Sequence, residues 1–390
     1  MKPKNWHVVP LGELCDVASG GTPSRAKASY FGGDVSWVKI GDMLQDPVVS
    51  TEECISADGL SASSAKVLPA GTLLLSIFAT IGRTAVLAIP AATNQAIAAI
   101  TPRNNERLTV SFLRRFLDHS VGGLQSQGRG VAQANINLSI LRRLPVPVPP
   151  IEEQRRIAAI LDKADELRAK RRATLAHLDS LTQSIFVDMF ADPRSILNEW
   201  PTRPLGALLD FLTSGSRGWA KNYSDTGSLF LRIQNVGDAR LLLDDVARVQ
   251  VPNAAEARRT RVEPGDVLLS ITADLGRTAV IPAEFGDAYI NQHLAILRTS
   301  AVDPVFLAHY LRSSTGSRQL LRLNREGVKA GLNFDDIRSV LVPLPPVSTQ
   351  MAFSQAVGKT SGLRSQSTAS ATELQGFLAS LQQRAFSGAL

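Results

Sequence analysis

The side chains that most often carry chemistry in proteins are scarce and scattered in this sequence. Histidine occurs at positions 7, 119, 177, 293 and 309, and the two cysteines are Cys15 and Cys54. None of them has the paired spacing of zinc ligands, so we expect no metal site. Phosphate-binding glycine loops, a G-x-S-x-G nucleophile elbow and the N-P-P-[YF] motif of amino-methyltransferases are also missing from the sequence. The sequence therefore predicts a binding protein rather than an enzyme.

Length and composition favour a globular chain of two or three domains. The 390 residues are 44% apolar and carry a formal net charge of +7, which permits a nucleic-acid partner. Half of this length can bury a core without disulfides, so we expect reduced cysteines and a cytoplasmic location. The N-terminal residues lack the apolar segment of a signal peptide. The longest uncharged apolar stretch, 67–82, is interrupted by Pro69 and Gly71, so we expect no membrane span.

An internal repeat organises the chain. The stretch LSIFATIGRTAV at 75–86 returns as LSITADLGRTAV at 269–280, and Gly82 and Gly276 are 194 residues apart. The Asn–Gln pairs at 94–95 and 291–292 and the double prolines at 149–150 and 345–346 keep nearly the same offset. An offset that stays constant over so many positions indicates a tandem duplication of one fold.

Each copy begins with a predicted sheet domain. Short β-type runs bounded by glycine and proline occupy 72–77 and 84–89 in the first copy and 228–233 and 266–271 in the second. A helical pattern follows near 110–120 and 304–314. The expected fold class is therefore α/β or α+β, with domains at 1–150 and 193–346.

Each copy ends in a predicted long helix, over 151–192 and 347–390, because the double prolines can precede but not continue a helix. The stretch 152–190 contains no glycine or proline, and its apolar residues recur every seven positions, interrupted by Arg171. The second helix has a Ser/Thr-rich middle, which forms helix weakly. The residues predicted to form the apolar seam are Ile157, Leu161, Ala164, Leu178, Leu181 and Ile185 in the first helix, and Leu374 and Leu381 in the second.

The order of these motifs resembles the specificity subunits of type I restriction–modification systems. The motifs are a W-x-x-x-P-L-G start, SGGTPS, IGRTA, an Asn–Gln pair, NIN, and PVPPIEEQRRIAAIL leading into the long helix. The resemblance covers both copies, although the second copy reads PLPPVSTQMAFSQAV and lacks the Glu-Glu and Arg-Arg pairs.

The resemblance implies two target-recognition domains, each reading one half of a bipartite DNA sequence. The two helices would pair as an antiparallel coiled coil and dock two modification (methyltransferase) subunits and a restriction subunit. The chain itself would be non-catalytic, without a cofactor, while S-adenosylmethionine, ATP and magnesium would be held by the partner subunits.

Residues that differ between the copies are the better candidates for reading two different half-sites. Two pairs of polar, glycine-flanked segments stand opposite each other, 20–29 with 214–224 and 125–137 with 322–333. Their Arg, Lys, Gln and Asn side chains suit guanine and adenine edges in the major groove. The residues predicted to contact DNA are Arg25, Lys27, Lys39, Arg129, Gln133 and Asn135 in the first copy, and Arg217, Lys221, Arg232, Arg322, Arg325 and Lys329 in the second.

Residues shared by both copies should instead be structural. Arg83 and Arg277, in the repeated G-R-T-A-V, are expected to form a salt bridge or a phosphate contact. The Asn–Gln pairs are expected to hydrogen-bond neighbouring loops. Three alternatives stay open: a coiled-coil scaffold for two enzymes, a specificity-like subunit of a related DNA-modification or phage-defence complex, and a DNA-modifying enzyme.

Overall fold

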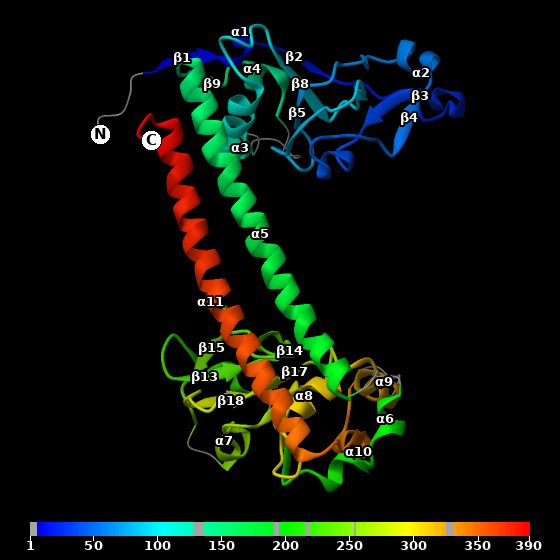
Figure 1. The fold of residues 1–390 in the computed structure, drawn as a ribbon, viewed down its shortest axis with the longest axis vertical. Helices are drawn as coiled ribbons and strands as arrows, with labels where there is room; N and C mark the ends of the chain where they lie inside the picture. The colour runs from blue at the N-terminus through cyan, green and yellow to red at the C-terminus, as the bar shows by residue number, and fades with distance from the viewer. Residues whose placement is uncertain (1–5, 128–135, 191–194, 216–217, 253–254, 325–330) are drawn as a thin grey trace. The chain divides into compact units, whose positions relative to one another are not determined.

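The computed structural model describes residues 6–127, 136–190, 195–215, 218–252, 255–324 and 331–390. The chain divides into two compact units, Met1–Arg172 with Ala369–Leu390, and Ala173–Thr368. Each unit contains one sheet domain together with a segment of each long helix, α5 (Ile151–Phe190) and α11 (Val347–Phe386) (Figure 1).

The first unit is built on a four-stranded antiparallel sheet in the order β2–β8–β5–β6. Its strands are β2 (Cys15–Ser19), β5 (Leu73–Ser76), β6 (Thr84–Val86) and β8 (Ile97–Pro102). Two smaller sheets accompany it, β4 (Glu53–Ile55) with β3 (Phe31–Val38) and β7 (Ala92–Thr93), and β1 (His7–Pro10) with β9 (Pro145–Val148). The helices are α1 (Leu11–Leu14), α2 (Ala57–Ser61), α3 (Val110–Gln127) and α4 (Leu138–Arg142).

The second unit repeats this plan with the same register. Its main sheet runs β11–β19–β16–β17–β14, and Val267 of β16 pairs with Val280 and Leu297, as Leu73 pairs with Val86 and Ile100. The main strands are β11 (Phe211–Ser214), β14 (Asp238–Ala239), β16 (Val267–Ser270), β17 (Thr278–Val280) and β19 (Leu294–Arg298). The predicted duplication of an α+β fold is therefore confirmed.

Smaller elements complete the second unit. The other strands are β10 (Thr202–Pro204), β12 (Tyr223–Ser224), β13 (Ser228–Leu231), β15 (Ala247–Val249), β18 (Ala288–Ile290) and β20 (Leu341–Pro343). The helices are α6 (Ile196–Glu199), α7 (Ala255–Thr260), α8 (Pro304–Arg312), α9 (Ser314–Leu323) and α10 (Phe334–Ser339).

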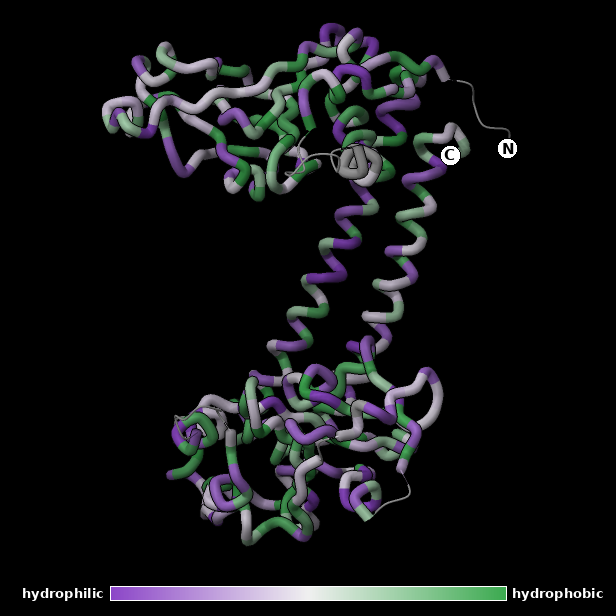
Figure 2. The backbone as a smooth tube through the Cα atoms, turned by 180° about the vertical axis from the view of Figure 1, so that it is seen from behind, coloured by the Kyte–Doolittle hydropathy of each residue, from purple (hydrophilic) through white to green (hydrophobic). Residues whose placement is uncertain are grey.

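The long helices run antiparallel within each unit. In the first unit Ile157 and Leu161, near the start of α5, share a core with Leu381 and Ala385 near the end of α11. In the second unit the end of α5 shares a core with Phe353 at the start of α11. Hydrophilic and hydrophobic residues alternate along both helices, as expected for helices that are buried on one side only (Figure 2).

The predicted seam is wrong at one position. Ile157, Leu161 and Ala164 are buried, and Leu178, Ile185, Leu374 and Leu381 are half-buried, but Leu181 is 45% exposed. The half-buried position is Thr182 instead, because the seam steps by four residues from Leu178 and then by three to Ile185. One residue corresponds to about 100° of helix rotation, which turns Leu181 toward solvent. Arg171, the polar interruption, donates a hydrogen bond to Ser370 of α11 at 2.9 Å.

A buried glutamine fixes the start of each long helix to its sheet domain. Gln154 is 0% exposed; its Oε1 accepts from the Thr109 N–H at 2.9 Å, and its Nε2 donates to the carbonyls of Arg107 and Pro149. Gln350 repeats the arrangement, accepting from the Asp303 N–H and donating to the Pro345 carbonyl. The glutamine of the P-P-x-x-x-Q pattern is thus a structural residue kept in both copies.

Replacement of Gln154 by alanine should lower the free energy of unfolding by about 2–4 kcal/mol, because it removes three hydrogen bonds made by a fully buried side chain and leaves the Thr109 N–H and two carbonyls without this partner. Urea unfolding measures the loss. Arg155→Ala is the matched control, since Arg155 is exposed and forms a surface ion pair with Glu152, and it should change stability by less than about 0.5 kcal/mol. Equal effects of the two substitutions would refute the structural role of Gln154.

Candidate nucleic-acid interface

In the first unit the Asn–Gln turn gathers several loops at one end of the main sheet. The Asn94 N–H donates to the Val38 carbonyl at 3.0 Å, so the turn meets the end of β3. The Gly21 N–H donates to the Thr93 carbonyl at 2.9 Å, and the side chains of Thr22 and Gln95 are hydrogen-bonded. These bonds hold the beginning of the predicted reading loop 20–29 against the turn.

The β5–β6 hairpin joins the same cluster. The Ile77 N–H donates to the Ala96 carbonyl at 2.8 Å, and the Ile136 N–H donates to the Ile77 carbonyl at 3.0 Å. Ile136 lies near the end of the second predicted reading segment, 125–137, so both segments are anchored at one sheet end. The second unit repeats three of these contacts, through the N–H groups of Asn291, Ile271 and Leu332. The Gly215 N–H donates to the Leu294 carbonyl, as the Gly20 N–H donates to the Ile97 carbonyl in the first unit. The expectation that the Asn–Gln pairs hydrogen-bond neighbouring segments is therefore confirmed for Asn94, Gln95 and Asn291, whereas the Gln292 side chain contacts the adjacent His293.

The repeated stretch of sequence forms a hairpin loop with an unusual backbone. Ala79 and Ala273 have φ of 55° and 59°, and Gly82 and Gly276 have φ of 93° and 83°. A left-handed alanine is unfavourable by about 1–2 kcal/mol, so surrounding contacts must hold it. The Ser76 hydroxyl supplies them in the first unit by donating to the Thr80 carbonyl and accepting from the Arg83 N–H, and Ser270 does the same in the second.

Three predicted DNA-contacting residues of the first unit are engaged within the protein. Arg25 forms an ion pair with Glu53 at 2.8 Å, and its guanidinium lies 4.3 Å from the centre of the Phe31 ring. Lys39 binds Glu52 and Glu53 at 2.7 and 2.8 Å, and these hydrogen bonds raise the pKa of its ammonium group. Lys27 donates to the Tyr30 hydroxyl at 3.0 Å. The charges of Arg25 and Lys39 are thus balanced by carboxylates beside them.

The second unit leaves more of its predicted cations available. Arg232 lies 3.5 Å from the Asp245 carboxylate. Lys221, in the 3₁₀ helix Trp219–Asn222, and Arg322, in α9, are both exposed, and no ion pair is found for either among the described residues. The remaining predicted residues lie outside the described part of the chain: Arg129, Gln133, Asn135, Arg217, Arg325 and Lys329.

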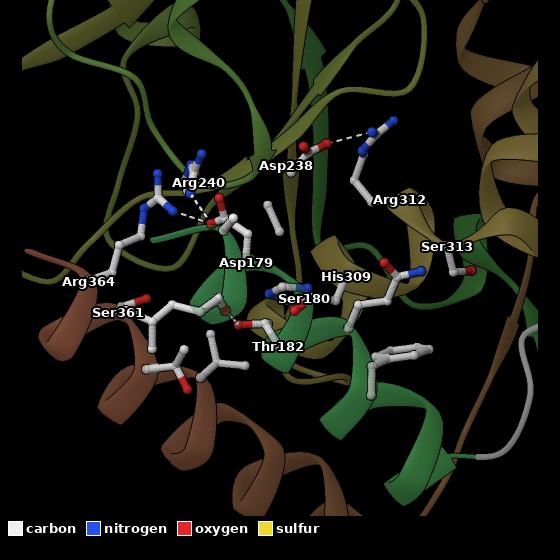
Figure 3. A pocket seen from close by; sticks show the side chains of 17 residues that line it. Asp179, Ser180, Thr182, Asp238, Arg240, His309, Arg312, Ser313, Ser361 and Arg364 are labelled. Carbon is white, nitrogen blue, oxygen red and sulfur yellow. Dashed lines mark hydrogen bonds and ion pairs between the residues drawn. The ribbon is translucent and has the colours of Figure 1, made fainter. Parts of the chain in front are cut away.

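A polar cavity of about 590 Å³ in the second unit was not predicted from the sequence (Figure 3). Asp179 of α5 accepts hydrogen bonds from Arg240, at 3.0 Å, and from Arg364 of α11, while Arg312 pairs with Asp238 across the cavity. Burial lowers the pKa of His309, which also lines the cavity, to about 4. This imidazole is therefore neutral at physiological pH, and the ion pairs tie both helices to the sheet domain.

Comparison of the copies could have indicated this cavity. Arg312 and His309 stand where the first copy has Asp118 and Arg115. In the first unit Arg115 instead binds two carboxylates of α5, Asp162 and Asp165. The two junctions between sheet domain and helix pair therefore use different charges in the same fold.

Two kinds of site are not found. The described residues contain no group of three or more His, Cys, Asp or Glu side chains arranged to hold a metal ion. Among the helices of the described ranges, none combines the length and the apolar character needed to cross a bilayer.

Fold and loops together define a tandemly duplicated α+β protein with two long antiparallel helix segments in each unit and polar loops gathered at one end of each main sheet. Residues 3–177 match the sequence model of the family described as type I restriction modification DNA specificity domain. The first copy of the duplicated chain is thus similar to this family of specificity domains.

Curated relatives and solved structures show the same similarity. The MjaIX specificity subunit of Methanocaldococcus jannaschii is 25% identical over 256 residues, covering 60% of this chain and 59% of the relative. The EcoR124I/EcoR124II specificity subunit of Escherichia coli is 32% identical over 168 residues, 40% of each chain. The chain thus matches less than two-thirds of the length of each of these relatives.

The solved structures extend the similarity in fold to the whole chain. A chain from a structure of a type I restriction–modification system in assembly and conformational transition aligns with a TM-score of 0.63 at 21% identity, covering 100% of this chain and 99% of the other. The S subunit from M. genitalium aligns with a TM-score of 0.59 at 15% identity, covering 99% of both chains.

Proposed function

We propose that this chain is the DNA-specificity subunit of a type I restriction–modification assembly, in which each sheet domain reads one half of a bipartite sequence. The observation that carries the proposal is the duplicated loop cluster: one hydrogen-bonded framework, built on Asn94 and Asn291, holds loops of different sequence in the two units. A common framework with different loops is what two different half-sites require.

The proposal assigns chemistry to other subunits. The chain is non-catalytic and acts in the cytoplasm, where it docks two modification subunits and a restriction subunit. Those subunits supply S-adenosylmethionine, ATP and magnesium. The match of residues 3–177 to the family model and the similarity to specificity subunits support this division of labour.

Methylation of a random DNA library by the full chain together with its modification subunits tests the proposal. The expected product is a two-part methylated motif with a constant gap. Methylation without sequence preference would favour the scaffold alternative. Methylation by this chain without other subunits would show that it is an enzyme.

The segments outside the described residues offer a sharper prediction. Arg129→Ala and Arg325→Ala should each relax one half of the motif and leave the other half intact, because the two arginines belong to corresponding segments of separate domains. A bidentate arginine contributes about 1–3 kcal/mol of base discrimination, which corresponds to roughly 5- to 150-fold. The readout is the methylated library, with Arg103→Ala as the control because Arg103 pairs with Asp16 near the start of β2. A loss spread evenly over all sequences would contradict base reading by these arginines.

A further inference from the structure

The two hairpin loops share a backbone but differ in one charge. In the second unit the guanidinium of Arg277 forms an ion pair with Asp274 of the same loop, and it also donates to the Val236 carbonyl at 3.5 Å. The residue at the position of Asp274 in the first copy is Thr80, which is exposed. The first loop therefore lacks the carboxylate that neutralises the second.

Arg83, the counterpart of Arg277, is left with a free charge. Its N–H and carbonyl are bound to Ser76, and among the described residues no ion pair or hydrogen bond engages its half-buried side chain. Residues 128–135, which precede the anchor at Ile136, contain no aspartate or glutamate. Arg25 and Lys39, by contrast, are paired with carboxylates. Arg83 and Lys27 thus both lack a carboxylate partner in the described loop cluster of this unit. Lys27 donates to the Tyr30 hydroxyl instead, whereas the Arg83 side chain has no partner among the described residues.

We propose that Arg83 binds a phosphate of the DNA backbone in the first domain, and that Arg277 does not do so in the second. The inference rests on the proposed function and adds an asymmetry to it. A phosphate is the suitable ligand because the same arginine stands in both copies, so its contact cannot distinguish two half-site sequences. The left-handed Ala79 and the Ser76 hydrogen bonds hold the loop in position for such a contact.

Exchange of the differing residue between the copies tests the proposal. Thr80→Asp gives Arg83 the carboxylate that Arg277 has, on a backbone that already accepts aspartate in the second unit. Arg83→Gln removes the charge directly. The reverse exchange, Asp274→Thr, frees Arg277, and Arg277→Gln is the matched control. Each variant is assembled with the modification subunits, and its affinity for cognate and random duplexes is measured from about 50 to 200 mM salt.

Thr80→Asp and Arg83→Gln should weaken binding to both duplexes by the same factor. If roughly eight phosphate contacts contribute equally to a nonspecific association constant of about 10⁵ M⁻¹, each contact contributes a factor of about four, so the loss of one contact should weaken binding about fourfold. The magnitude of the slope of log K against log salt concentration should fall by about 0.9. Asp274→Thr should strengthen binding by a similar factor. Arg277→Gln should change binding by less than about twofold, because its charge is already paired.

The outcomes separate this inference from the proposed function. Specific binding by the wild-type assembly, with unchanged affinity and salt slope for Arg83→Gln, would refute the phosphate contact alone. A loss restricted to one half-site sequence would show that Arg83 reads a base, which also overturns the proposal. A wild-type assembly that shows no sequence preference would contradict the proposed function itself.

Discussion

Phe190→Ala is expected to lower the free energy of unfolding by about 3–5 kcal/mol. Phe190, at the end of α5, is 0% exposed, and its ring lies 5.1 Å from Phe186, 4.7 Å from Phe306 and 5.3 Å from Phe353, centre to centre. The cluster joins both long helices to α8, so truncation removes contacts with three elements and leaves a cavity. Urea unfolding with a constant m-value is the measurement.

The duplication supplies a matched control for this prediction. Phe386 occupies the corresponding place at the end of α11, packing on Phe112, Phe116 and His119, but it is only half-buried. Phe386→Ala should therefore cost less, about 1–3 kcal/mol. Phe190→Leu, which retains most of the volume, should cost about 1–2 kcal/mol. A larger loss for Phe386→Ala than for Phe190→Ala would contradict this account of the junctions.

Asp266→Ala is expected to destabilise the second unit by about 2–4 kcal/mol. The Asp266 carboxylate is fully buried and accepts from Arg298 Nε at 2.7 Å, from Arg298 Nη2 at 2.9 Å and from the Glu263 N–H at 2.7 Å. Its removal leaves the Glu263 N–H without this acceptor and a partly buried guanidinium without its bidentate partner. Arg298 retains its exposed contact with Glu263, which keeps the expected loss below that of a fully buried pair.

The first unit shows how the same strands are built without this ion pair. Thr72 and Thr101 stand at the positions of Asp266 and Arg298, and the Thr72 hydroxyl donates to the Pro69 carbonyl at 2.8 Å. The double variant Asp266→Thr, Arg298→Thr should therefore recover more than half of the stability lost on Asp266→Ala. Urea unfolding of the wild-type protein, Asp266→Ala and the double variant is the test. If the double variant is as unstable as Asp266→Ala, the ion pair contributes more to folding stability than the free energy needed to remove its two charges from water.

Much of the fold could be predicted because its signals are local or repeated. The strands at 72–77 and 266–271 are apolar runs closed by glycine, and α5 and α11 begin directly after Pro150 and Pro346. The apolar seam of the long helices was harder to predict from the sequence. Arg168 and Thr182 occupy companion positions of the heptad, while the apolar Leu167 and Leu181 beside them are exposed. If the most apolar residue near each companion position is assigned to the seam, the assignment is wrong by one residue. The positions of the seam are set by the heptad repeat that starts at Ile157 and Leu161.

The pairing of charges could not be predicted from sequence distance. Glu53 lies on β4, yet it binds Arg25 in the loop after β2 and Lys39 at the end of β3. The cavity in the second unit likewise combines Asp179 of α5, Arg240 after β14 and Arg364 of α11. Only the folded chain brings these groups together, because strand pairing and helix packing determine which distant segments meet.

The hairpin loop that is held by the hydroxyl of Ser76 or Ser270 has a consequence for how such a protein can evolve. Its backbone is held by Ser76 and Gly82 in one unit and by Ser270 and Gly276 in the other, whereas the tip residues Phe78 and Thr80 are Thr272 and Asp274 in the second copy. Substitutions at the tip therefore leave the hydrogen bonds that shape the loop in place. The same twelve-residue stretch thus contains the residues that hold the backbone and the tip residues that vary between the copies. New surface chemistry can therefore arise at the tip without loss of folding stability.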